Sequence, residues 1–176
     1  MDMHSFTVEH VPDGHRQNML GATGRVLDAA RDAGVTVIYV GIGRRPDFSS
    51  PRNKFTSRAR PPASPAEAAE RARFVEAIAP RENDAIIRKP RMSAFYSSEL
   101  QSMLAARDVE TLVLSGVATN FVVESTARYA VDADYRVILL EDCCGAASEE
   151  EHTRALASME PLVHIASSEE FLASLR

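Results

Sequence analysis

The chain has 176 residues, of which 45% are hydrophobic and 26% charged, and this composition is typical of a globular protein with a core of its own. The net charge of −5 and the pI of about 5.6 argue against nucleic acid or an anionic membrane surface as the main partner. The sequence has no apolar run near the ~18 residues of a membrane span, and its first residues lack a signal-peptide pattern.

Short β-branched runs alternate along the chain with amphipathic stretches of helical period. The strands that we expect cover residues 35–40, 84–88, 111–115, 135–140 and 162–165. The helices that we expect cover residues 16–33, 97–106, 120–133, 148–159 and 168–175. This alternation predicts a three-layer α/β/α fold with a mainly parallel, Rossmann-like doubly wound sheet, in one domain over residues 1–176.

Residues 41–65 break this alternation, because five prolines stand there among serines and arginines. A long excursion of this kind is a lid, a binding loop or a plain surface connection, and the sequence favours none of the three. The basic residues between Arg44 and Arg60 favour a solvated loop over a pocket for an anion.

The carboxyl ends of parallel strands are where ligands bind in doubly wound sheets. Three segments follow expected strands in this way: residues 89–95, 116–120 and 141–145. Asp2 precedes an expected loop near the start of the chain. We expect functional side chains among these segments.

These segments resemble the isochorismatase-like hydrolase family of the cysteine hydrolase superfamily. Residues 89–95 are similar to the segment that carries the family's catalytic lysine, and residues 115–128 are similar to its cysteine segment. Asp2-Met3-His4 looks like the Asp-Met-Gln that carries the catalytic aspartate. The resemblance implies a six-stranded parallel sheet, a homodimer or larger homo-oligomer, and a cis peptide bond at Val117–Ala118.

Val122 stands where the resemblance places the nucleophilic cysteine. An isopropyl group has no lone pair, so an acyl-enzyme at this position is excluded. True isochorismatases also lack this cysteine and hydrolyse a vinyl ether, a reaction for which an acid and a positioned cation suffice.

The resemblance therefore implies two catalytic residues, Asp2 as the general acid and Lys89 as the cation that tunes it and holds a substrate carboxylate. Backbone N–H groups at a helix N-terminus would favour an anionic part of the substrate. The substrate-binding residues implied are Phe95, Val117, Ala118, Thr119 and Val122.

The start of the chain departs from the family, whose aspartate ends a central strand of about six residues. Only Met1 precedes Asp2 here, so we expect a truncated first strand. A parallel sheet without an interior strand leaves unpaired ladder groups on two neighbouring strands. Either the natural start lies upstream, or something else fills the gap.

No metal or cofactor is expected. Residues 41–48 contain no histidine where zinc-binding relatives carry one, and the five histidines of the chain show no ligand spacing. His10 and His15 read as solvated residues, and His164 alternates within a strand. Asp142 reads as the cap of a turn or helix.

The function favoured by these residues is hydrolysis of a small, anionic vinyl ether of the isochorismate type by Asp2 and Lys89. One alternative is a non-catalytic relative that binds a ligand or forms oligomers on the same scaffold. Another is a C–N amidase that uses Cys143 or Cys144, although buried cysteines usually act as small hydrophobes. Since these adjacent cysteines are a poor disulfide framework, we expect a protein of the reducing cytoplasm.

Overall fold

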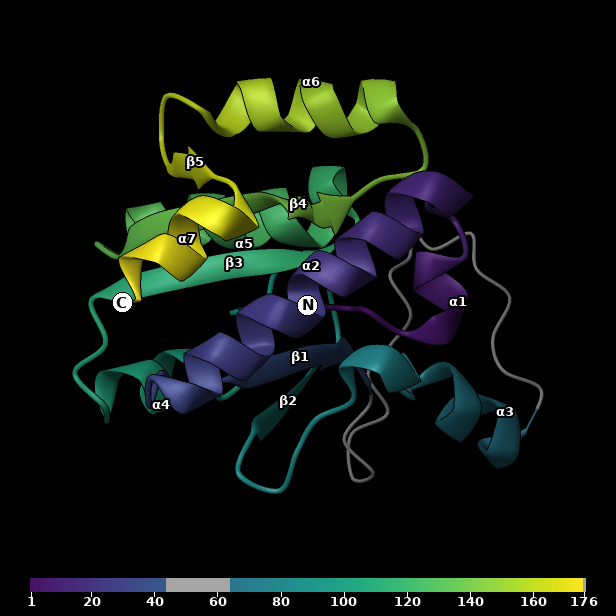
Figure 1. Ribbon diagram of the computed structural model, residues 1–176. Coiled ribbons are helices and arrows are strands. Elements are labelled where there is room, and N and C mark those ends of the chain that lie inside the picture. Colours follow the sequence, from purple (N-terminus) through teal and green to yellow (C-terminus); the bar gives the residue numbers. More distant parts are fainter. Residues whose placement is uncertain (44–63, 176) are drawn as a thin grey trace.

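Five parallel strands form two hydrogen-bonded sheets in the computed structural model, which describes residues 1–43 and 64–175 (Figure 1). In one sheet β1 (Ile38–Ile42) pairs with β2 (Ala85–Lys89). In the other, β4 (Arg136–Gly145) lies between β3 (Thr111–Val117) and β5 (His164–Ala166). The expected mainly parallel arrangement is confirmed. Most of the proline-rich segment at 41–65 lies outside the described residues.

Helices cover both faces of the strands, which gives the expected three layers (Figure 1). α2 and α7 pack against one face of β4. α5 and α6 pack against the other face of this strand and against each other. The helical segments are α1 (Ser5–Val8), α2 (Asp13–Asp32), α3 (Pro65–Arg71), η1 (Glu76–Ile78), α4 (Leu100–Ala105), η2 (Thr119–Val123), α5 (Glu124–Asp132), α6 (Glu149–Met159) and α7 (Ser168–Ser174). Of these, α1, α3 and η1 were not expected from the sequence.

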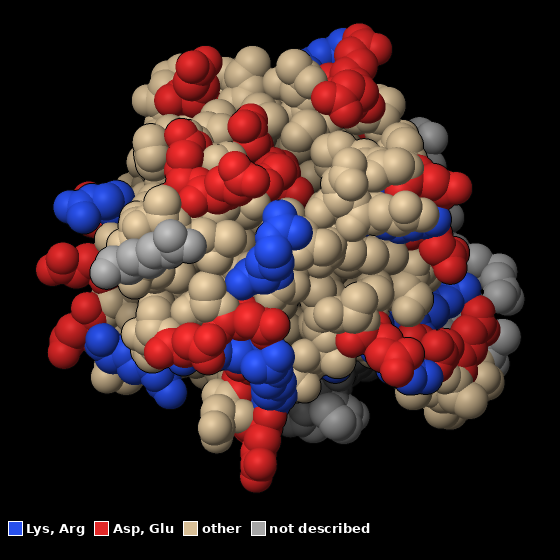
Figure 2. Space-filling model, viewed as in Figure 1, with Lys and Arg blue, Asp and Glu red and all other residues tan. Residues whose placement is uncertain are grey.

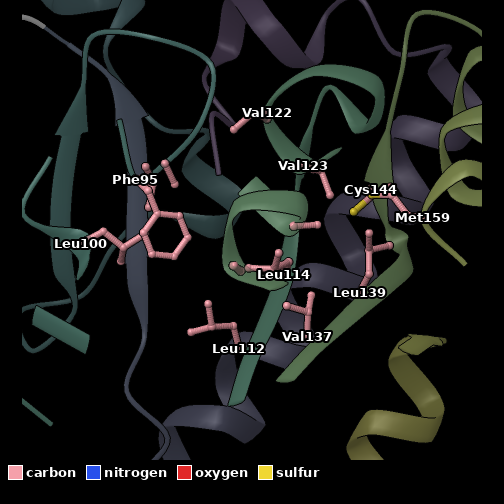
Figure 3. Close-up of a cluster of buried hydrophobic side chains, with 14 of the residues drawn as sticks. Phe95, Leu100, Leu112, Leu114, Val122, Val123, Val137, Leu139, Cys144 and Met159 are labelled. Carbon is pink, nitrogen blue, oxygen red and sulfur yellow. The ribbon is translucent and has the colours of Figure 1, made fainter. Parts of the chain in front are cut away.

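The core is divided by the side-chain alternation of the strands. Leu112 and Leu114 of β3 join a cluster with residues of α4, α5 and α6, whereas Val113 packs on the α2 and α7 side. Figure 3 shows the first of these clusters, which we call the α5-side core. It contains Phe95 and Val122, two of the expected substrate-binding residues.

The two sheets are joined through Met1 and Asp2, which lie between β1 and β3. The Met1 amine donates to Ser115 O at 2.8 Å, and Val117 N donates to Met1 O at 3.1 Å. On the other side Asp2 N donates to Val40 O at 2.7 Å. Two residues therefore hold a place in the ladder where the resemblance implied a full strand. The expectation of a six-stranded sheet is corrected to five strands and this link among the described residues.

The end of β4 also differs from expectation, because this strand continues to Gly145. Residues 141–145 were expected to follow the strand, but Cys143 and Cys144 are buried in it, and Cys144 and Gly145 pair with Gly116 and Val117 of β3. Apolar packing on both faces explains this extension.

The surface view places basic side chains among acidic ones. On the face drawn in Figure 2, Lys and Arg of the described residues form no continuous patch. None of the described helices is long and apolar enough to cross a membrane.

We predict that Gly116→Ala destabilises the fold strongly. Gly116 has a φ of 155°, and a Cβ there would lie 2.4 Å from Met1 O, so the substitution strains the backbone and displaces the N-terminal link. We expect the free energy of unfolding to fall by about 2–4 kcal/mol in denaturant titrations. Gly14→Ala is the control, because a Cβ at this α2 position meets nothing within 4 Å. Equal stability of the two variants would contradict the proposed role of the link.

Candidate active site

A buried ion pair joins the first residues of the chain to the end of β2. Lys89 Nζ donates to Asp2 Oδ2 at 2.7 Å and to Arg91 O at 2.8 Å. The Lys89 side chain is 0% exposed and that of Asp2 is 5% exposed. The structure thus brings together the two residues that the resemblance implied as catalytic, and neither is the surface residue that its type usually is.

The local fold around Asp2 fixes the direction of its carboxylate. Asp2 has a φ of 53°, in the left-handed region that aspartate tolerates better than most residues. His4 N and the Thr7 hydroxyl both donate to Asp2 O, which ties the residue to the start of α1. Lys89 is the last residue of β2 and pairs with Ile42 of β1. Both charged groups are therefore held by backbone contacts.

Burial governs the electrostatics of this pair. It lowers the pKa of Lys89 below its ordinary value, and the neighbouring Asp2 carboxylate opposes this effect. His4, two residues after Asp2, is also fully buried, and burial lowers its pKa while Asp2 again opposes. One carboxylate oxygen, Asp2 Oδ1, is buried without a hydrogen-bond partner. This atom is the free acceptor of the site.

A helix N-terminus lies beside the link of Met1 to β3. The peptide bond Val117–Ala118 is cis, as the resemblance implied. From Thr119 the chain enters η2 and continues without a break into α5, with Phe121 N donating to Ala118 O at 3.1 Å. The first N–H groups of a helix generally have no partner within it, so the groups that precede Phe121 N can attract anionic or carbonyl oxygens.

The expected substrate-binding residues do not form one group. Val117 and Ala118 pack with Met3 in a cluster beside α1 and α2. Phe95 and Val122 lie in the α5-side core (Figure 3). The Phe95 ring stacks on Tyr129, with ring centroids 4.6 Å apart. Thr119 is buried, and its hydroxyl lies 2.8 Å from His152 Nδ1.

The two cysteines lie on opposite sides of β4. Cys144 is part of the α5-side core, next to Leu139 and Met159 (Figure 3), and Cys143 packs with Val26 and Phe171 under α2 and α7. Burial raises the pKa of each thiol to about 12. Both thiols are therefore protonated at neutral pH. Because only a thiolate attacks efficiently, neither cysteine is an effective nucleophile there.

Two histidines have contacts that the sequence did not indicate. His15, which we expected to be solvated, is partly buried, with Nε2 2.7 Å from Cys144 O. Its ring meets His152 edge-on at 5.1 Å between centroids. His152 shares one buried face of α6 with Ala155 and Met159. Their spacing of three and seven residues is the sequence signal that could have predicted the burial of His152.

Asp142 has a capping role, although not for the helix that follows it. Its carboxylate accepts from Ser168 N at 2.7 Å and from the Ser168 hydroxyl, at the start of α7. Two hollows in the described surface also lie away from the ion pair, one between α2 and η1 and one between α2 and α7. Neither hollow is lined by Asp2 or Lys89, whose side chains are buried.

The profile of the isochorismatase domain matches residues 2–170, which is nearly the whole chain. The chain belongs to the isochorismatase family. A ureidoacrylate amidohydrolase, RutB, of Azorhizobium caulinodans is 34% identical over 145 residues, which are 74% of this chain and 64% of that protein. The isochorismatase family protein YecD of Escherichia coli O157:H7, described as uncharacterized, is 37% identical over 56% of this chain and 53% of its own.

Solved structures of the isochorismatase family share the fold. An isochorismatase family protein from Burkholderia thailandensis is 28% identical, with a TM-score of 0.85 over 99% of this chain and 92% of that one. The N-carbamoylsarcosine amidase of Thermoplasma acidophilum is 21% identical with a TM-score of 0.73, a likeness of fold alone. The chain spans less than two thirds of the length of the two curated relatives named above.

We predict that breaking the ion pair from one side is costly and that removing both charges is less so. Lys89→Met leaves the Asp2 carboxylate buried alone, so the free energy of unfolding should fall by about 3–5 kcal/mol. The double variant Asp2→Asn/Lys89→Met should recover at least half of this loss in the same denaturant titration. Arg154→Met, which breaks an exposed pair with Glu150, should cost less than about 1 kcal/mol. Additive effects of the two site substitutions would refute the coupling.

We also predict a loss of stability on mild acidification. Burial lowers the pKa of His4 and of His152 below the ordinary 6.5, so between the lowered and ordinary pKa values the unfolded chain binds more protons than the folded one. Stability then rises with pH and falls on acidification through this window. The free energy of unfolding should be lower at about pH 5.5 than at about pH 7.5, and the difference should shrink in His4→Phe. An unchanged difference in that variant would exclude His4 as a source.

Proposed function

We propose that the protein hydrolyses the C–N bond of a small amide or ureide, with Asp2 and Lys89 as the reacting pair and water as the attacking group. The observation that carries this proposal is the buried Asp2–Lys89 contact at 2.7 Å with one carboxylate oxygen left free. An amidohydrolase among the relatives supports C–N hydrolysis as the reaction class.

The free oxygen of Asp2 serves as the general base in this reaction. Oδ1 takes a proton from water as the water oxygen bonds to the substrate carbonyl carbon, and the carbonyl electron pair moves onto its oxygen. First-turn N–H groups of the η2–α5 helix stabilise that oxyanion. The C–N bond then breaks as the nitrogen takes the proton back from Asp2, and an acid and an amine leave.

Direct attack by water is supported by the chemistry of the residues that could otherwise supply a nucleophile. Val122 stands at the position that resembles the family's nucleophilic cysteine, and it lies buried in the α5-side core. The two thiols that the chain does have are buried and protonated. We therefore assign the nucleophile to neither Cys143 nor Cys144. Lys89 contributes a fixed positive charge that favours the anionic transition state.

Hydrolysis of a vinyl ether of the isochorismate type is the second candidate. The absence of a thiol at position 122 favours it, because protonation of the double bond and capture by water need no nucleophilic side chain. Asp2 would then act as the acid. The two candidates use the same pair and differ in the substrate that is turned over.

The test is product formation from a panel of small amides and ureides and from isochorismate. We expect turnover of at least one amide or ureide, and Asp2→Asn should lower its kcat/KM by at least about 100-fold, the usual share of a general base. Asp13→Asn is the matched control, since Asp13 is an exposed residue of the first turn of α2. Turnover of isochorismate alone would establish the second candidate instead.

Thiol chemistry is tested separately in the same panel. Val122→Cys should create a second, alkylation-sensitive activity, whereas Val123→Cys, one residue on and also buried, should not. Alkylation of wild-type protein should leave the activity unchanged. Loss of the wild-type activity on alkylation would refute attack by water, and a folded protein inactive on every compound would support a non-catalytic binding role.

A further inference from the structure

Two histidines that the proposed reaction does not use meet beside the carboxyl end of β3. His15 of α2 places Nε2 2.7 Å from Cys144 O, and Cys144 pairs with Gly116 of β3. His152 of α6 places Nδ1 2.8 Å from the hydroxyl oxygen of Thr119, the first residue of η2. The two rings meet edge-on, with centroids 5.1 Å apart. The histidines therefore bond α2 to β4 and α6 to η2 at one place.

The entry to η2 is connected to the ion pair through the backbone. Val117 N donates to Met1 O at 3.1 Å, and the next residue after Met1 is Asp2. Ala118 lies between Val117 and Thr119, at the point where the chain leaves β3 and enters η2. The N–H groups to which the proposed reaction assigns the oxyanion belong to this entry. The entry is held on one side by Met1 and on the other by the bond of Thr119 to α6.

The direction of the hydrogen bond between Thr119 and His152 follows from burial. Thr119 is 0% exposed, and His152 Nδ1 is the only partner of its hydroxyl among the described residues. If Nδ1 carried a hydrogen, the hydroxyl would have to accept, and its own hydrogen would be buried without an acceptor. Nδ1 of the neutral ring therefore accepts from Thr119. Uptake of a proton by His152 reverses this bond.

The charge on His152 depends on its burial and on two close neighbours. Burial contributes most and lowers the pKa of His152, a positive charge on His15 lowers it further, and Glu149 opposes both effects. Glu149 Oε2 lies 3.8 Å from His15 Nδ1. Glu151, on the same turn of α6, accepts from the side-chain amide of Asn120 of η2 at 3.4 Å. The neutral ring is thus the favoured state at neutral pH.

The charged groups that other elements bring to α6 cancel one another or are neutral. Glu124 and Arg128 of α5 both bond to Ser158, near the far end of α6, and form an ion pair with each other at 2.8 Å. Cys144 of β4 packs in the same core as α6, and burial raises the pKa of its thiol to about 12. Protonation of this region on mild acidification therefore falls on the two histidines.

We propose that His152 is a positioning residue of the reaction, which accepts the Thr119 hydroxyl hydrogen and so holds the entry to η2 where its N–H groups stabilise the oxyanion. This inference rests on the proposed function. His152 acts through Thr119 and the backbone and contacts no reacting atom. Protonation of His152 leaves the Thr119 hydrogen without an acceptor, so this hold weakens on acidification. The bond of Val117 to Met1 is independent of it, so the ion pair stays in place.

The first test is amide hydrogen exchange, which requires no turnover. Thr119→Val keeps the shape of the side chain and removes the hydroxyl, so exchange at Phe121 and Val123, whose N–H groups donate to Ala118 O, should become about tenfold faster or more. Thr119→Ser keeps the hydroxyl and should change the rates little. Thr23→Val is the matched control, since this buried threonine of α2 is bonded to neither η2 nor α6. Equal rates in folded Thr119→Val and Thr119→Ser would overturn the proposal.

The second test is the kinetics of a compound that the protein hydrolyses. His152→Leu should lower kcat by about tenfold or more and leave KM nearly unchanged, because misplaced N–H groups weaken binding of the transition state rather than of the substrate. The side-chain oxygen of asparagine accepts near the place of Nδ1 and does not titrate. His152→Asn should therefore restore kcat at neutral pH and move the acid-side fall of kcat to lower pH.

A residue that only stabilises the fold predicts neither the rescue nor the altered pH profile. Unchanged kcat in folded His152→Leu, or the same pH profile in wild type and His152→Asn, would overturn the proposal while leaving the hydrolase activity intact. Faster exchange in Thr119→Val without turnover of any amide or ureide would refute the proposed function and leave the bond of Thr119 to His152 established.

Discussion

The buried contact between Asp2 and Lys89 is the constraint on which the site and much of the fold depend. Two charges removed from water are tolerated only when they are paired and hydrogen-bonded, so the chain must keep both residues in place. Lys89 is held by β2, and Asp2 by its bonds to Val40 and to the start of α1. Through Met1 the same segment bonds to β3. The ion pair therefore lies where the two sheets meet.

The chemistry proposed for the protein follows from what this arrangement leaves unsatisfied. Lys89 occupies one oxygen of the carboxylate and the other stays free. His4, two residues further along the chain, also has a buried nitrogen without a partner, Nε2. Both thiols, by contrast, are placed in apolar clusters where burial keeps them protonated. The pair thus keeps an oxygen atom without a partner, whereas the sulfur atoms pack in the core.

The sequence predicted the parts of this structure that depend on local patterns. The β-branched run 111–115 became β3, the helical period over 120–133 became η2 and α5, and the motif around Lys89 indicated the correct strand end. Long-range contacts decided the rest. The period of a strand cannot reveal that Met1 and Asp2 link the two sheets. The contact between His4 Nδ1 and the Arg73 carbonyl oxygen likewise joins residues 69 positions apart in the sequence.

The most direct test of this account is ¹⁵N NMR of the lysine side chains, because the sequence has only two lysines, Lys54 and Lys89. A buried ammonium bonded to Asp2 exchanges its hydrogens slowly, so one lysine Nζ signal should persist at neutral pH with its attached protons. Asp2→Asn removes the opposing charge and should abolish that signal, because burial then lowers the pKa of Lys89 without opposition. A spectrum without a protected ammonium in the folded wild-type protein would contradict the buried pair and the site built on it.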